Sequence, residues 1–81
     1  MKITVKLFAS VRDLCGFDEK EIIVPEGITV EEVLKRLTVS FPGLGAKRAA
    51  LLCAINEEYA PPDAALAEGN VLAVFPPVSG G

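Results

Sequence analysis

The sequence predicts an α+β domain in which one main helix packs on one face of a mixed sheet of four or five strands. Short segments near both ends of the chain alternate polar and apolar side chains, which is typical of half-buried strands. One longer segment, residues 29–37, instead has the apolar spacing of a helix. Because a single helix can bury only one face of such a sheet, the other face must stay open or be covered in another way.

Two strands with a short helix between them are expected in the first third of the chain. Residues 2–8 alternate polar and apolar side chains, and the inward face carries Ile3, Val5 and Leu7. Phe8 falls on the opposite face, with the polar residues of the strand. Ser10 and Gly16 are placed to begin and end a short helix. A second alternating strand covers residues 19–24 and stops at a Pro-Glu-Gly turn.

The clearest element is the main helix. Thr29 and Glu32 have the spacing of a capping box, and Ile28 and Val33 have the spacing of a hydrophobic staple. The residues at i, i+3, i+4 and i+7 form one apolar stripe: Val30, Val33, Leu34 and Leu37. A proline and two glycines in residues 42–45 then predict a loop.

The C-terminal half supplies the remaining strands. Residues 51–55 form an apolar run that predicts a buried strand, followed by a turn and a short piece around Tyr59. In the last strand, residues 71–75, both faces are apolar, so one faces the helix and the other, together with Phe8, faces water. Either a partner covers this apolar patch, or the loop of residues 57–67 does.

Composition excludes several classes of protein. The chain has 81 residues and 8.6 kDa, which is enough for one small domain. Its net charge is −3 and its basic residues are scattered, so we expect no nucleic-acid binding. The longest apolar run, residues 49–55, is far shorter than the ~20 residues that span a bilayer. No signal-peptide core is visible either, and a cytoplasmic protein without a membrane partner is expected.

The sequence offers little for independent catalysis or metal binding. Cys15 and Cys53 are far apart in the chain and form no C-x-x-C pair, so two reduced, buried thiols are expected. The absence of histidine removes the usual general base at neutral pH. It also makes a zinc site improbable, and no metal ligands are assigned.

The C-terminal residues 76–81 form a distinct tail after a domain of residues 1–75. Pro76 and Pro77 hold the backbone extended without N–H donors of their own. The last two residues, Gly80 and Gly81, have no β-carbon and can enter a narrow channel. The terminal carboxylate could become an acyl-adenylate by attack on the α-phosphate of ATP, with AMP then displaced by sulfur or an amine. The chain has no phosphate-binding motif, so an ATP site must lie on another protein. The alternative is that the two glycines are simply a polar chain end.

Three segments carry a resemblance to one family: residues 7–16 (LFASVRDLCG), residues 51–56 (LLCAIN) and residues 75–81 (FPPVSGG). Together they resemble the small subunit of molybdopterin synthase, the MoaD family of sulfur carriers, over essentially the whole chain. The first block and the FPPVSGG ending are the most specific parts, since other ubiquitin-like sulfur carriers share the Gly-Gly end but generally lack the FPPV segment. Residues 38–50 match no motif of the family.

The resemblance implies a ubiquitin-like β-grasp fold and a site at the C-terminus. Gly81, preceded by Gly80, would be adenylated by an E1-like enzyme that uses ATP and Mg²⁺, and then converted to a thiocarboxylate. The sulfur would come from a cysteine desulfurase or a rhodanese-type donor. The chain itself would bind no cofactor.

The resemblance also implies a large-subunit partner. The tail would enter the active site of that subunit, which holds cyclic pyranopterin monophosphate, and two carriers would serve each substrate in a heterotetramer. Residues expected to contact the partner are Phe8, Tyr59, Phe75, Pro76, Pro77, Val78 and Ser79. Core packing is the alternative role for Phe8 and Phe75. Tyr59 carries a hydroxyl where the family usually has an apolar interface residue.

Two other functions compete with this one. The carrier could deliver sulfur to thiamine, tungsten-cofactor or tRNA chemistry, or be joined to lysines as a protein modifier; the FPPVS segment argues against the thiamine route. Alternatively, the chain is an interaction module whose C-terminus is never activated.

Overall fold

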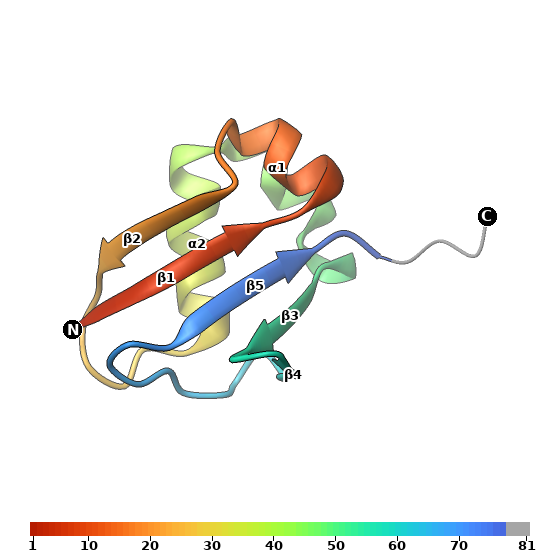
Figure 1. The fold of residues 1–81 in the computed structure, drawn as a ribbon. Helices are drawn as coiled ribbons and strands as arrows, with labels where there is room; N and C mark the ends of the chain where they lie inside the picture. The colour runs from red at the N-terminus through yellow and green to blue at the C-terminus, as the bar shows by residue number, and fades with distance from the viewer. Residues whose placement is uncertain (78–81) are drawn as a thin grey trace.

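The computed structural model describes residues 1–77, which form a mixed five-stranded sheet with helices on one face (Figure 1). The strands are β1 (Lys2–Leu7), β2 (Glu19–Ile23), β3 (Leu52–Ile55), β4 (Glu58–Tyr59) and β5 (Val71–Phe75). The helices are α1 (Ala9–Cys15), α2 (Val30–Ser40) and the 3₁₀ helix η1 (Pro42–Ala50). The predicted α+β class and the single main helix are confirmed.

The order of strands across the sheet is β2-β1-β5-β3-β4. β1 and β5 pair in parallel, and every other neighbouring pair is antiparallel. β5 therefore lies between the first strand and β3, in the middle of the sheet. This places the end of β5, and the start of the tail, beside the end of β1 and the start of β3.

α2 forms as its sequence predicts. The Thr29 hydroxyl accepts a hydrogen bond from the Glu32 amide at 3.2 Å, and the Thr29 amide donates to a Glu32 carboxylate oxygen at 3.1 Å. These reciprocal bonds satisfy helix donors that would otherwise lack partners. The apolar stripe of α2 packs on the sheet in one core, whose most deeply buried side chains include Ile3, Val5, Leu7, Val11, Val30, Val33, Leu44, Leu72 and Val74.

The start of α1 differs from the prediction. Ser10 does not cap the helix; Phe8 is the N-cap residue, and no side chain bonds to the first turn. Ala9 instead has a left-handed backbone, with φ of 52°, and turns the chain sharply out of β1 into the helix. Gly16 ends α1 with φ of 81° and donates its amide to the Arg12 carbonyl at 2.8 Å, as predicted.

Two further segments depart from the sequence-based expectations. Residues 42–45 do not form a plain loop but begin η1, which buries Leu44 in the core. The strand expected at residues 51–55 begins at Leu52, and it is not buried throughout, because Leu52 is 39% exposed.

The connection between β4 and β5 does not cover the open face of the sheet. Its backbone runs along the start of α2: the Val30 amide donates to the Ala64 carbonyl at 3.0 Å, and the Glu31 amide donates to the Pro62 carbonyl at 2.8 Å. Leu66 is buried in the core on the same side. The alternative that residues 57–67 shield the open face is therefore wrong, except that Glu57 and Tyr59 stand at its edge.

Candidate functional site

The open face of the sheet is apolar on one half. Along β5, Leu72 and Val74 are buried beneath the helices, whereas Val71, Ala73 and Phe75 point to the opposite face and are only partly buried. The neighbouring strand β3 contributes Leu52, which is paired with Phe75. We call this surface the outer apolar face and define it as Phe8, Leu52, Ala54, Tyr59, Val71, Ala73 and Phe75.

Phe8 and Phe75 form the centre of this face at the end of β5. Their ring centroids are 4.7 Å apart and their planes differ by 12°. The Phe8 amide donates to the Val74 carbonyl at 3.2 Å, which fixes the Phe8 backbone beside the C-terminal end of β5. Phe8 remains 39% exposed. The two aromatic residues predicted to face a partner are thus brought together, outside the core.

Tyr59 and Leu52 extend the face toward the edge of the sheet. Tyr59 lies on β4 opposite Ala54 and is 76% exposed, which agrees with its predicted place on the partner-facing surface. Leu52 is not among the residues predicted to contact a partner. The alternation of side chains along the strand could have placed it, because Leu52 shares a face with Ala54 and lies opposite the face of buried Cys53.

The outer apolar face is hollowed, with a concavity of about 640 Å³ between β5, β4 and the turn that joins β3 to β4. Lys6 and Glu57 stand at its rim. A concave apolar surface with polar residues at its rim is typical of a protein-interaction site.

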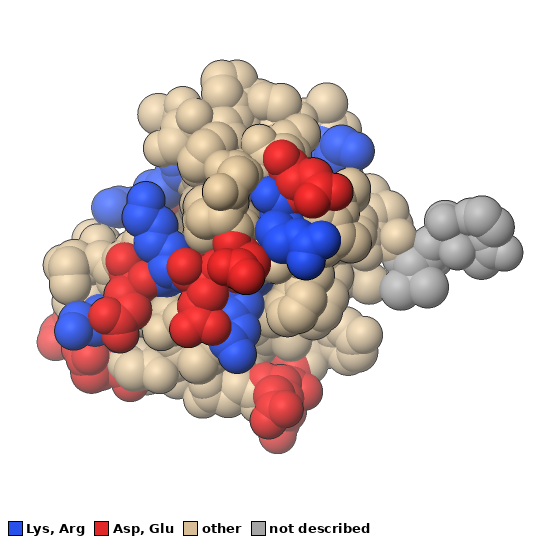
Figure 2. Space-filling view, turned by 45° about the horizontal axis from the view of Figure 1, so that its top comes forward, with Lys and Arg blue, Asp and Glu red and all other residues tan. Residues whose placement is uncertain are grey.

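The other half of the open face is polar. Lys2 and Lys6 of β1 lie 3.9 and 3.8 Å from Glu21 and Glu19 of β2, and all four side chains are largely exposed. In Figure 2, positive and negative side chains alternate over the surface in view, and neither sign forms a continuous patch. This surface therefore lacks the basic stripe with which proteins bind nucleic-acid phosphates.

The tail begins at the aromatic pair. Phe75 is the last residue of β5, and Pro76, half-buried, and Pro77, exposed, follow it directly. The remaining predicted site residues, Val78, Ser79, Gly80 and Gly81, lie outside the described residues.

Neither thiol is suited to carry sulfur itself. Cys15 and Cys53 are both free and buried. Burial raises the pKa of the Cys53 thiol to about 11 and also raises the pKa of Cys15, so both are protonated at neutral pH. Since the thiolate is the nucleophilic form, both side chains are unreactive apolar residues of the core. Within residues 1–77, no cluster of three potential metal ligands occurs. None of the helices in that same range is long and apolar enough to cross a membrane.

The sheet order, the single main helix and the open apolar face next to the last strand define a ubiquitin-like β-grasp protein. The ThiS family model matches residues 5–81, and the chain belongs to this family. Within it, the chain is similar over its whole length to molybdopterin synthase sulfur carrier subunits, the MoaD family. It is 37% identical to the "Molybdopterin synthase sulfur carrier subunit" of Arabidopsis thaliana, over all of this chain and 84% of that protein.

Solved structures confirm the β-grasp fold. A putative molybdopterin converting factor, subunit 1, from Pyrococcus furiosus superimposes with a TM-score of 0.85 at 34% identity, covering 96% of this chain and 99% of that one. SAMP1 from Haloferax volcanii, a small archaeal modifier protein, superimposes with a TM-score of 0.81 at 30% identity, with both chains fully covered. The chain is thus similar both to sulfur carriers and to a protein modifier.

Proposed function

We propose that this chain is the sulfur-donating small subunit of a molybdopterin synthase and that the carboxylate of Gly81 carries the sulfur. The observation that carries the proposal is the stacked pair of Phe8 and Phe75 on an open apolar face, at the root of the tail. A subunit that covers this face holds the tail at the same time. The names of the curated relatives, which are similar over the whole chain, support the same function.

The proposed chemistry at Gly81 starts with activation of a poor electrophile. A carboxylate oxygen attacks the α-phosphate of ATP, the bond to pyrophosphate breaks, and an acyl-adenylate forms. A persulfide sulfur then attacks the acyl carbon and AMP leaves. A second thiol cleaves the resulting sulfur–sulfur bond and is oxidised to a disulfide, which leaves a thiocarboxylate on Gly81.

The second stage transfers sulfur to the substrate, cyclic pyranopterin monophosphate. The thiocarboxylate sulfur attacks an oxygen-bearing substrate carbon, the carbon–oxygen bond breaks, and the oxygen leaves with a proton. Water then cleaves the acyl–sulfur bond, so the sulfur stays on the substrate and Gly81 returns as a carboxylate. Two carriers supply the two sulfur atoms of the product, in a heterotetramer with two large subunits.

These steps require other proteins, because neither cysteine of this chain is suited to supply the sulfur. Both thiols are protonated and buried. An E1-like enzyme would supply the ATP and Mg²⁺ site, and a cysteine desulfurase or rhodanese-type protein would supply the persulfide. The contribution of this chain is a rigid domain that docks and a narrow tail that enters each active site. A closed site also protects the activated acyl group from water.

The test is the mass of the C-terminal peptide after incubation with ATP, Mg²⁺, the host's E1-like enzyme and a persulfide donor. Cleavage after Glu68 releases residues 69–81, a peptide without methionine or cysteine. This choice matters because oxidation of Met1 or of a thiol adds nearly the same mass as exchange of oxygen for sulfur. We expect a thiocarboxylate on Gly81 of this peptide, and consumption of that species when the large subunit and its substrate are added.

A chain with one alanine added after Gly81 is the matched control, because it has the same domain and a displaced carboxylate. It should fold normally and remain unmodified. An unmodified wild-type peptide, with the enzymes shown to be active on another carrier, would contradict the proposal and favour a plain interaction module.

The similarity to the archaeal modifier protein supports a second candidate, in which an amine takes the place of sulfur. In that reaction a lysine amine attacks the Gly81 adenylate, AMP leaves, and an isopeptide bond joins the two proteins. Lysine residues of cell proteins carrying a remnant of residues 69–81 after the same digestion would reveal it.

A further inference from the structure

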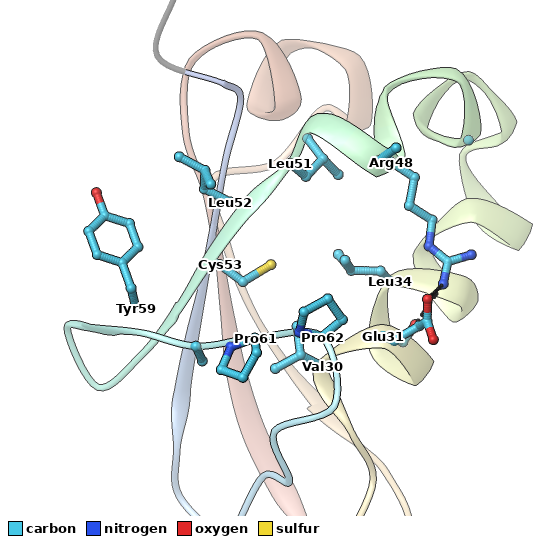
Figure 3. Close-up of a pocket in the computed structure, with 13 residues that line it drawn as sticks. Val30, Glu31, Leu34, Arg48, Leu51, Leu52, Cys53, Tyr59, Pro61 and Pro62 are labelled. Carbon is cyan, nitrogen blue, oxygen red and sulfur yellow. Dashed lines mark hydrogen bonds and ion pairs between the residues drawn. The ribbon is translucent and has the colours of Figure 1, made fainter.

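A second concavity lies on the other side of β3, between that strand and the helices (Figure 3). It has a volume of about 830 Å³ and is open to solvent. We call it the edge groove. Its floor is formed by the buried side chains of Val30, Leu34 and Cys53, and its walls by η1, Leu51 and the Pro61–Pro62 segment. No step of the proposed function uses it.

The lining of the edge groove is apolar and carries no net charge. The Cys53 thiol at its floor is neutral at physiological pH because of its burial. The two charged residues, Arg48 and Glu31, form an ion pair with an N–O distance of 2.8 Å on one wall. Burial of a lone charge in such a groove would be costly, so an occupant that fits it is itself apolar.

The edge groove is continuous with the outer apolar face. Tyr59 lines both concavities, and Leu52 lines the edge groove. Leu52 is also the residue paired with Phe75, at the root of the tail. A protein that covers the outer apolar face and encloses the tail therefore reaches the mouth of the edge groove without a gap.

The groove side of β3 has room for an extended chain. β4 pairs with Ala54 and Ile55, and the Ala60 amide donates to the Cys53 carbonyl at 2.9 Å. Within residues 1–77, no strand lies on that side of β3 before Cys53. An extended segment beside an uncovered strand edge can use backbone hydrogen bonds for affinity and place alternate side chains in a pocket.

We infer that the edge groove docks an extended apolar segment of the large subunit, which passes around the β3–β4 edge from the outer apolar face. This inference rests on the proposed function, because it assumes that the large subunit covers the outer apolar face. The large subunit would then contact β3 on both sides, through the outer apolar face and through the edge groove, with Leu52 between these two surfaces.

Ala49 allows a direct test, because it is exposed and lines the edge groove on η1. We expect Ala49→Glu to raise the Kd for the large subunit about tenfold or more, since it places a charge in an apolar contact. Ala46→Glu is the matched control: Ala46 is exposed on the same 3₁₀ helix but does not line the groove. Its Kd should stay within about twofold of wild type.

Phe8→Lys separates failure of this inference from failure of the proposed function, because Phe8 belongs to the outer apolar face alone. If Phe8→Lys weakens binding and Ala49→Glu does not, the edge groove is no docking site and the proposed interface stands. If neither weakens binding, the proposed interface itself is wrong. Equal thermal unfolding of Ala49→Glu, Ala46→Glu and wild type shows that the domain is intact. Phe8→Lys loses the stacked ring and should unfold at a lower temperature, so its fold is checked by a single cooperative transition above the temperature of the binding assay.

Hydrogen exchange of the unaltered complex gives a second measurement. Amides of residues 45–51 and of Tyr59 and Ala60 should exchange more slowly when the large subunit is bound, in addition to those near Phe8. Protection of residues near Phe8 alone would overturn the inference. A second result would also overturn the inference: Ala49→Glu abolishes self-association of the free carrier but leaves the Kd for the large subunit unchanged. The occupant of the edge groove would then be a second copy of this chain.

Discussion

The Phe8 and Phe75 rings lie one on the other, with centroids 4.7 Å apart, although 67 positions separate them in the chain. Parallel pairing of β1 with β5 brings the ends of both strands to the same edge of the sheet, and the left-handed turn at Ala9 holds Phe8 there. The stack therefore connects the residue that follows β1 to Phe75, the last residue before the tail.

The stack should contribute to folding beyond the area that its rings bury. In a double-mutant cycle of Phe8→Leu and Phe75→Leu, we expect a coupling free energy of about 1 kcal/mol, measured by urea unfolding. Each leucine keeps an apolar side chain and removes only the ring. A coupling near zero would show that the rings are adjacent without stabilising one another.

Leu52 should matter for partner binding more than for stability. Leu52→Lys places a charge on the outer apolar face, and we expect the affinity for the large subunit to fall at least about tenfold, measured by calorimetry. Ile23→Lys is the matched control, because Ile23 is 72% exposed and belongs to β2 at the far edge of the sheet. An equal loss of affinity in both variants would mean that the contact is not confined to the apolar half.

The turn between β3 and β4 contains backbone strain that a substitution can relieve. Asn56 and Glu57 have φ of 49° and 72°. Asn56 suits this conformation, and its side-chain oxygen also accepts the Val71 amide at 2.8 Å. Glu57 has no such compensation, so Glu57→Gly should raise the free energy of unfolding by about 0.5–1 kcal/mol.

Glu58→Gly serves as the control for that change, since it removes the same charge one residue later. Glu58 lies in β4, where glycine weakens a strand, so this variant should be less stable than wild type. Urea unfolding at one pH compares the two. Stabilisation by both substitutions would assign the effect to charge and not to the turn.

Cys53 should make the protein less stable in alkali. Its folded pKa of about 11 lies above the unfolded value of 9.0, so the unfolded state releases its proton first as pH rises. The stability that this neutral thiol contributes is complete below pH 9.0 and is lost as pH rises from there to about 11, by roughly 1.4 kcal/mol for each pH unit of the interval. Cys53→Ala should be less stable at pH 7 but should lose less on going to pH 10.5. Parallel pH curves for the two proteins would contradict this assignment.

The sequence predicted those elements whose side chains carry the signal. α2 was predicted from the Thr29–Glu32 capping box and its apolar stripe, and both are present in the structure. The strands followed from alternation, which also placed Phe8 on the face opposite Ile3 and Val5. In the continuous apolar run of residues 51–55, by contrast, the residue types alone do not distinguish exposed Leu52 from buried Cys53.

The features that could not be predicted depend on backbone conformation and on distant contacts. Nothing about an alanine indicates a positive φ, so the sequence favours Ser10 over Phe8 as the start of α1. The segment beside the start of α2 is held by backbone carbonyls of Pro62 and Ala64, which leave no pattern in the side chains. The edge groove likewise arises only when η1, α2 and β3 come together.

The central position of β5 also determines how the domain responds to a pull on its tail. β5 is hydrogen-bonded to β1 on one side and to β3 on the other. Force applied through Pro76 along the strand therefore loads both rows of hydrogen bonds in shear at once, whereas an edge strand pulled in the same direction would load only one row. The domain should therefore withstand a pull on its tail better than it would if β5 lay at the edge of the sheet.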